Sequence, residues 1–191
     1  MDYKNIDPRI LKINTNELCA RLAIPLQCDF DFSELYERLV SEAKPAYVTK
    51  RVELIRENGE IRIGGIKTSS KALWRFSSGA SGYILLVATL GIGVDRLILK
   101  TSKISAKESF IIDAMADALI EALCDYAQKE VGECSSVGGR FSPGYADLEL
   151  DAGYEILKAC NAEKLLGIKI TESGLMAPKK SVNAIIAVKE V

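Results

Sequence analysis

The segment richest in groups that could bind a small molecule is 140–145, with the sequence Arg-Phe-Ser-Pro-Gly-Tyr. It follows Gly138-Gly139, and glycines let a ligand approach the backbone closely. Arg140 offers a planar fork of donors for a carboxylate, Gly144 exposes its backbone, and Tyr145 offers a ring face with a hydroxyl tip. This set suits a zwitterionic ligand that carries an aromatic group. The alternative is a structural turn at the Pro-Gly pair, with the arginine paired to a nearby acid.

Four carboxylates recur at every fourth position of one segment: Asp113, Asp117, Glu121 and Asp125. Residues four apart lie on one face of an α-helix, so we expect these side chains to form an acidic ridge. Like charges at this spacing destabilise a helix by about 0.2–0.5 kcal/mol a pair. The pattern favours a solvated ridge, and the alternative is a ridge that binds a cation. The short basic run Lys179-Lys180 is expected in a solvated turn.

The composition excludes several function classes. The 191 residues include no histidine, which rules out Ser-His-Asp and Cys-His catalytic groups and His-ligated zinc. The five cysteines form no Cys-x-x-Cys pair, so no zinc or redox motif is expected and the thiols fit a reducing cytosol. The 25 basic and 26 acidic residues argue against a general nucleic-acid or membrane-surface binder, although a local patch is compatible with them. We expect a cytoplasmic protein without metal, nucleic-acid or membrane partners.

Apolar periodicity predicts the elements that position these groups. A long helix should begin at Ser105, whose capping box with Glu108 marks the start, and run to about residue 131. Asn58-Gly59 between alternating apolar residues predicts a β-hairpin, and the apolar run 83–89 is typical of a buried central strand. We further expect the only tryptophan, Trp74, in the core. The remaining expectations are helices after Asn14 and over 32–44, 67–76, 94–102 and 150–161, a loop over 132–145, and strands over 168–171 and 182–188.

Together these elements predict a mixed α+β fold. It consists of a twisted, largely antiparallel sheet with packed helices and a short N-terminal helical leader. At about 150 residues per domain, the length fits one domain with a small appendage. We place the N-terminal helical segment at 1–45, packed on a main α+β domain at 46–191.

Three ordered blocks of sequence resemble the reactivation domain of cobalamin-dependent methionine synthase. Arg140-x-x-x-Gly144-Tyr145 resembles its Arg-Pro-x-Pro-Gly-Tyr segment. The helical stretch 114–122 is similar to its Ala-Leu-Ala-Asp…Leu-Ala-Glu-Ala helix. The third block matches its Thr-Glu-Ser…Met-x-Pro…Ser-Val run at the same spacing, through Thr171-Glu172-Ser173, Met176-x-Pro178 and Ser181-Val182.

The resemblance implies both a fold of that type and a ligand. In that family the domain binds S-adenosylmethionine and docks over the corrinoid. An electron from a flavodoxin-like donor and the methyl group of S-adenosylmethionine then restore methylcobalamin from the inactive Co(II) state. By position, the resemblance implies that Arg140 holds the methionyl carboxylate and that the Pro143-Gly144-Tyr145 backbone contacts the adenosine. It also implies Glu121 as a polar contact and Ser142 as a further residue of the ligand site.

The same resemblance implies a stand-alone activation protein that acts in trans. The absence of histidine excludes an Asp-x-His-x-x-Gly cobalamin ligand, so cobalamin would enter only through a partner. The implied partners are a cobalamin-binding methionine synthase or related corrinoid protein, and a flavodoxin-like or ferredoxin electron donor. The chain would then be part of a methyltransferase system and not a complete enzyme alone. Two other classes stay open: a self-sufficient small-molecule methyltransferase that uses S-adenosylmethionine, and a corrinoid-protein docking module that binds no ligand.

Overall fold

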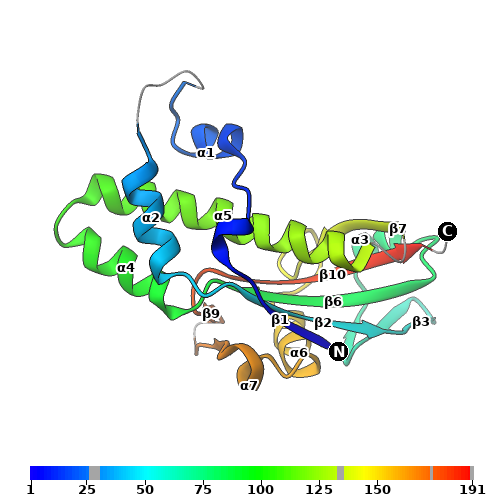
Figure 1. Cartoon of the computed structure of the whole chain (residues 1–191). Coiled ribbons are helices and arrows are strands. Elements are labelled where there is room, and N and C mark those ends of the chain that lie inside the picture. The colour runs from blue at the N-terminus through cyan, green and yellow to red at the C-terminus, as the bar shows by residue number, and fades with distance from the viewer. Residues whose placement is uncertain (26–30, 133–135, 173, 190–191) are drawn as a thin grey trace.

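A five-stranded antiparallel sheet in the order β1-β2-β6-β10-β7 forms the centre of the molecule (Figure 1). The computed structural model describes residues 1–25, 31–132, 136–172 and 174–189. The strands of this sheet are β1 (Asp2–Asn5), β2 (Ala46–Val52), β6 (Gly82–Thr89), β7 (Ser136–Phe141) and β10 (Ser181–Lys189). Smaller antiparallel sheets are formed by β3 (Leu54–Glu57), β4 (Glu60–Ile63) and β5 (Ile66–Thr68), and by β8 (Lys169–Ile170) and β9 (Met176–Ala177). The predicted mixed α+β class is confirmed.

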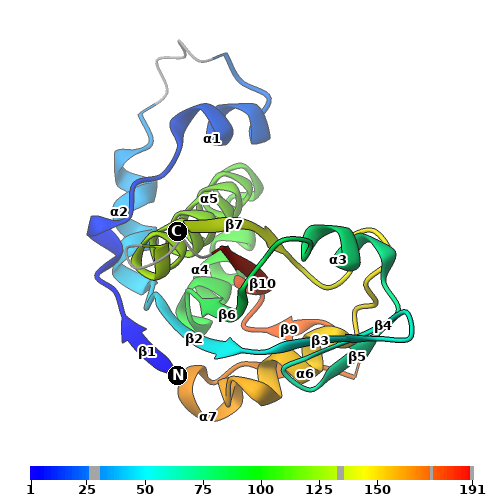
Figure 2. The same cartoon turned by 90° about the vertical axis from the view of Figure 1, so that its right-hand side faces the viewer.

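Helices cover both faces of the central sheet. Figure 2 shows α4 and α5 on one side of it and α6 and α7 on the other. The long helix α5 contacts β2, β6, β7 and β10, whereas α6 and α7 pack on the opposite face. The helices are η1 (Pro8–Ile10), α1 (Thr15–Arg21), α2 (Ser33–Glu42), α3 (Lys71–Phe76), α4 (Ile92–Ser102), α5 (Ala106–Gly132), α6 (Ala152–Ala159) and α7 (Ala162–Leu166).

Strand β6 divides the hydrophobic core in two. Every residue of β6 is buried, as the apolar run predicts. Because successive side chains of a strand point to opposite faces, Ile84 and Leu86 join the core under α5, while Leu85 and Val87 join the core under α6. The sheet therefore fixes α5 and α6 relative to each other, and the segments between them are held at its edge.

Local capping explains where several helices begin. The Asn14 side chain accepts hydrogen bonds from two backbone N–H groups at the start of α1, and the Ser70 hydroxyl accepts one from the Leu73 N–H at the start of α3. At the start of α5, the hydroxyl of Ser105 accepts from the N–H of Glu108 at 3.2 Å. The carboxylate of Glu108 bonds to Arg38 instead of closing the capping box.

The predicted hairpin at Asn58-Gly59 is confirmed. The two residues have φ values of 50° and 81°, and β3 and β4 pair on either side of them. Positive φ at both central positions is what an Asn-Gly turn of the I′ type requires.

Four local expectations were wrong. The first residues form β1, which pairs with β2, although its side chains are exposed and give no apolar pattern. The expected helix at 67–76 is split, because 66–68 forms β5 before α3 begins. The expected loop at 132–145 contains β7. Trp74 is partly exposed, with the Arg56 guanidinium 5.3 Å from its ring centroid.

The N-terminal segment shares the main core. Leu18 of α1 and Leu35 and Leu39 of α2 are buried in the cluster that contains α5. A boundary at residue 45 stays a prediction. Among the described residues no helix is both long and apolar enough to cross a bilayer. Cys28, Cys134 and Ser173 lie outside the described residues.

Candidate functional site

Arg140 lies on the strand β7 and not in a loop. Its backbone is opposite Ile186 of β10, and Phe141 is opposite Ile185. Neighbouring side chains of a strand point to opposite faces, and here Phe141 enters the core beside Phe76, with ring centroids 5.1 Å apart. Arg140 therefore projects to the other face, toward α5. The strand gives this arginine a fixed backbone, which suits a residue that recognises a ligand.

The Arg140 guanidinium is already bonded to three side chains of α5. One terminal nitrogen, Nη1, donates to Asp125 Oδ1 at 2.6 Å and to Gln128 Oε1 at 3.0 Å. The other, Nη2, donates to Glu121 Oε2 at 2.8 Å. We call Arg140, Glu121, Asp125 and Gln128 the arginine cluster. The predicted contact between Arg140 and a nearby acid, given above as the structural alternative, is thus present.

Not every N–H group of Arg140 is used in the arginine cluster. A guanidinium has five N–H groups, of which three are used here, so two of the Arg140 groups have no acceptor among the described residues. The side chain is 20% exposed, and Asp125 is 72% exposed. Burial by itself lowers the pKa of Arg140, but the hydrogen bond that Arg140 donates to Asp125 and the surrounding negative charges raise it by more, so the net direction is upward. The guanidinium stays cationic and can donate hydrogen bonds to another carboxylate.

The expected solvated turn at Lys179-Lys180 was wrong for Lys180, whereas the ridge carboxylates of Asp113 and Asp117 keep 47% and 36% exposure. Lys180 is buried, with a side chain 10% exposed, and its Nζ lies 2.9 Å from Asp113 and 2.6 Å from Asp117. We call these three residues the lysine cluster. The N–H of Lys179 donates to Asp95 in the first turn of α4, which holds the turn before β10 in place. Lys180 and Arg140 thus each bridge two of the four ridge carboxylates, which also stay partly exposed to solvent.

The turn after β7 is closed by its own hydrogen bonds. The Gly144 N–H donates to the Leu148 carbonyl at 2.8 Å, and the Tyr145 N–H donates to the Ser142 carbonyl at 3.2 Å. The carbonyls of Pro143 and Gly144 accept no hydrogen bond from the described residues. The turn can therefore offer acceptors to a ligand, whereas its N–H groups are engaged.

Gly144 is required by this geometry. Its φ is +83°, and a Cβ added there would lie 2.8 Å from a Leu150 methyl carbon. Tyr145 is exposed, and its ring stands edge-on to Phe141 at a centroid distance of 5.4 Å. The far end of the turn is held by Asp147, which accepts from the N–H groups that begin α3. The Ser70 hydroxyl and these N–H groups lower the pKa of Asp147.

A pocket of about 250 Å³ opens beside Ser142 and Pro143. Asn183 on β10 is one of the residues that line this pocket, and its side chain is 8% exposed. No sequence motif marked this residue as part of a site. Its amide nitrogen contacts only the Met176 sulfur, at 3.3 Å, and its amide makes no other hydrogen bond within the described residues. A buried amide normally has stronger partners, so Asn183 is available to a ligand. The other lining residues are Leu150, Gly153, Ile170, Gly174, Leu175, Met176, Ser181 and Val182.

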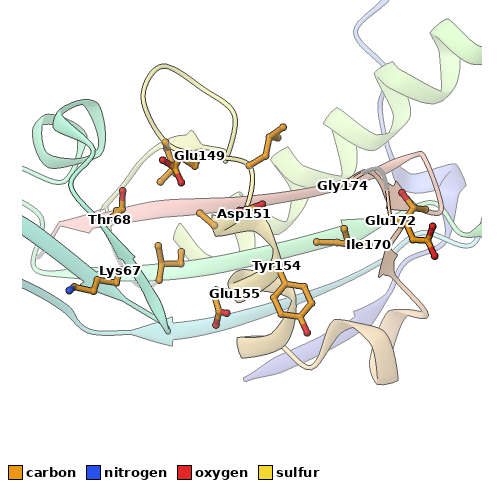
Figure 3. A pocket seen from close by; sticks show the side chains of 14 residues that line it. Lys67, Thr68, Glu149, Asp151, Tyr154, Glu155, Ile170, Glu172 and Gly174 are labelled. Atoms are coloured by element: carbon orange, nitrogen blue, oxygen red, sulfur yellow. The ribbon is translucent and has the colours of Figure 1, made fainter.

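A larger hollow of about 540 Å³ adjoins this pocket and shares Leu150, Ile170 and Gly174 with it. Figure 3 shows Glu149, Asp151 and Glu155 around it, from α6 and the segment before it, with Lys67 and Thr68 of β5 at one end and Glu172 at the other. Tyr154 adds an aromatic ring. The two hollows form one continuous depression with a negatively charged outer part.

The six predicted site residues fall into three groups. Glu121 and Arg140 are joined by an ion pair, Ser142 and Pro143 line the smaller pocket, and the Gly144-Tyr145 pair forms the turn above it. Because β7 carries Arg140 straight into this turn, the three groups are consecutive along one edge of the sheet. No group of His, Cys, Asp and Glu side chains suited to a metal ion occurs in the part of the chain that the structure describes.

The comparisons with known proteins agree with this architecture. No family model matches the chain, and no curated protein matches it in sequence. Among solved structures, the crystal structure of the MetH reactivation domain bound to AdoHcy is similar, with a TM-score of 0.74 at 17% sequence identity. The match covers 98% of this chain and 78% of that one. The chain therefore has the α+β fold of a methionine synthase reactivation domain.

Proposed function

We propose that the protein binds S-adenosylmethionine and supports the reductive remethylation of a Co(II) corrinoid held by a partner in trans. The partner would be a cobalamin-binding methionine synthase or a related corrinoid protein. A flavodoxin-like or ferredoxin donor would supply the electron. The observation that carries the proposal is Arg140, a partly buried guanidinium with two unused donors on β7, two residues before Ser142, which lines the smaller pocket. The matched structure, which bears AdoHcy, supports the ligand class.

The residues fit both ends of this ligand. The two remaining N–H groups of Arg140 suit the methionyl carboxylate, which can also displace the exposed Asp125. Glu121, one helical turn before Asp125 on α5, is an acceptor for the methionyl ammonium. At the other end, the free carbonyls of Pro143 and Gly144 and the Asn183 amide suit an adenine edge, which presents both donors and acceptors.

The chain's own residues bind and orient the ligand and perform no bond-making step. S-adenosylmethionine supplies an activated methyl group when bound. The side chains at the predicted site include no histidine and no reactive thiol, since burial raises the pKa of the nearby Cys124 to about 12. The depression on this face is open, so the reacting end of a ligand held here would be accessible to a partner.

Titration calorimetry tests the ligand assignment directly. Replacing Arg140 with Ala should weaken S-adenosylmethionine binding about 10- to 150-fold, because a hydrogen bond to a charged group contributes roughly 1.5–3 kcal/mol. Arg140→Lys keeps the charge without the fork and should recover part of the loss. Glu121→Gln should cost less. Unchanged affinity with a lowered melting temperature in Arg140→Ala would leave the arginine cluster as a structural ion pair.

A reconstitution assay tests the activity. The protein is mixed with a Co(II) methionine synthase that lacks its own reactivation domain, a low-potential reductant and S-adenosylmethionine. The corrinoid spectrum should change to the methylated form only when all components are present. Equal conversion without the protein contradicts the proposal, and methyl transfer to a small molecule without corrinoid would favour a self-sufficient methyltransferase.

A further inference from the structure

The outer end of the α4–α5 helical pair exposes large apolar side chains. Ile104, between the helices, is 82% exposed, and Phe110, in the second turn of α5, is 59% exposed. Leu99 near the end of α4 is exposed as well. This end projects beyond the ends of the strands (Figure 1), and Leu97 and Ile98 on its inner side pack against the core under α5. Exposed apolar side chains gathered at one place mark an interaction surface more often than isolated ones do.

Basic side chains surround these apolar groups. Arg96, Lys100, Lys103 and Lys107 are all exposed, and the sequence from Arg96 to Lys107 contains no acid. The two carboxylates that flank this stretch in sequence are engaged elsewhere: Glu108 pairs with Arg38 at 2.8 Å, and Asp95 accepts from the Lys179 N–H. The near-zero net charge of the chain therefore conceals a local surface with four positive charges. We call the residues 96–110 of this end the basic tip.

We propose that the basic tip docks on an anionic phospholipid surface. Its exposed apolar side chains and its lysines fit a bilayer interface, where apolar side chains sink below the headgroups while ammonium groups meet the phosphates. Each basic residue near such a surface strengthens binding about fivefold, which is the fold-change that corresponds to about 1 kcal/mol. A second copy of the chain is disfavoured as the occupant of this face, because two basic tips facing each other repel.

Docking through the tip leaves the predicted ligand site free. Phe110 and Glu121 are eleven residues apart on the continuous helix α5, which corresponds to about 17 Å along its axis. A bilayer touching the tip would therefore not cover the arginine cluster. The proposal is independent of the ligand and of the proposed activity. It concerns only the attachment of the protein to an anionic membrane surface.

Vesicle sedimentation tests the proposal. The full chain is spun with vesicles of phosphatidylcholine alone or of phosphatidylcholine mixed with phosphatidylglycerol. Binding should occur only with the anionic mixture and should fall steeply with added salt. Ile104→Asp combined with Phe110→Asp should reduce the bound fraction at least about tenfold, as should Gln at Lys100, Lys103 and Lys107 together.

Matched controls separate the tip from general effects. Ile55→Asp changes an exposed apolar residue on β3, and Gln at Lys71, Lys158 and Lys164 removes three exposed charges elsewhere. Both should bind vesicles as the wild type does, and circular dichroism confirms folding of every variant. No sedimentation with anionic vesicles, or equal loss in the controls, overturns the proposal. It is also overturned if tip variants instead abolish self-association in light scattering, or binding to the methionine synthase probe.

Discussion

The lysine cluster and the arginine cluster occupy successive halves of the same ridge on α5, yet they differ in what they leave available. Both place one cation, Arg140 from β7 or Lys180 from the turn before β10, between two carboxylates four residues apart, and so turn a repulsive spacing into two ion pairs. Lys180 concentrates its charge at one nitrogen, which touches both acids. Arg140 spreads its charge over a fork and retains unused donors. The lysine cluster only links α5 to the turn before β10, whereas the arginine cluster links α5 to β7 and still has donors for a ligand.

The largest expected effect concerns the thiol beneath the arginine cluster. Burial raises the pKa of Cys124 from 9.0 to about 12, a change that Arg140 opposes. At a given pH below both values, the folded protein should therefore carry about a thousandfold less Cys124 thiolate than the unfolded chain. Iodoacetamide labelling, read site by site by mass spectrometry, should therefore be at least about a thousandfold slower at Cys124 in native than in urea-unfolded protein, because burial also restricts access of the reagent. Rapid native labelling would mean that α5 opens beneath Arg140.

The same thiol gives a signed pH dependence. Its folded pKa is above its unfolded value, so its contribution to stability is fully present below about pH 9 and is lost as pH rises toward 12. Urea unfolding across this alkaline range should show a steeper decline for the wild type than for Cys124→Ala. Parallel curves would contradict the assignment.

The next largest effect should come from breaking the lysine cluster. Lys180→Met removes the cation that touches both Asp113 and Asp117 and leaves Arg21, 3.6 Å from Asp117, beside the pair. We expect the free energy of unfolding to fall by about 2 kcal/mol, less than for a fully buried pair because both carboxylates are partly exposed. The melting temperature should drop by about 4–8 °C in a chain of this size. Lys179→Met is the control, and an equal drop there would show that Lys180 acts only as part of the turn.

A smaller effect should sharpen the role of the exposed acid. If a ligand carboxylate competes with Asp125 for Arg140, then Asp125→Asn should strengthen S-adenosylmethionine binding about two- to fivefold, the range expected for an exposed ion pair. Titration calorimetry measures this change. Weaker binding in this variant would mean that Asp125 orients Arg140 and does not compete with the ligand.

The smallest expected effect defines the boundary between the clusters. Asp113→Asn removes one partner of Lys180, two turns from Glu121, and should leave S-adenosylmethionine affinity unchanged while lowering stability by less than about 1 kcal/mol. An affinity loss similar to that of Glu121→Gln would show that the two clusters act as one electrostatic unit.

Local signals predicted most of the fold. Three features were each predicted from a few consecutive residues, and all three are present. They are the apolar strand β6, the Asn58-Gly59 turn and the Ser105 cap. Strand β7 was missed because its Gly-Gly-Arg stretch lacks apolar alternation, and its hydrogen bonds come from the distant β10. Edge strands with one partner need no strong pattern of their own.

The site was predictable only in part, for a related reason. The family resemblance singled out Arg140 and Glu121, and the structure joins them. The partners of Lys180 are more than sixty residues away in sequence, and no spacing rule connects such positions. Asn183 is a polar residue in an apolar strand, but only the pocket beside Met176 makes its amide conspicuous.

The position of β10 within the sheet constrains how the molecule is assembled. This strand is synthesised after every other described strand, yet it lies between β6 and β7 and pairs with both. Ser181 meets Thr89 across more than ninety residues of chain, so the sheet cannot close until that sequence has left the ribosome. Until then β6, apolar on both faces, has one unpaired edge, which is a template for association with other chains. Nascent chains of this fold are therefore expected to depend on chaperones during that interval.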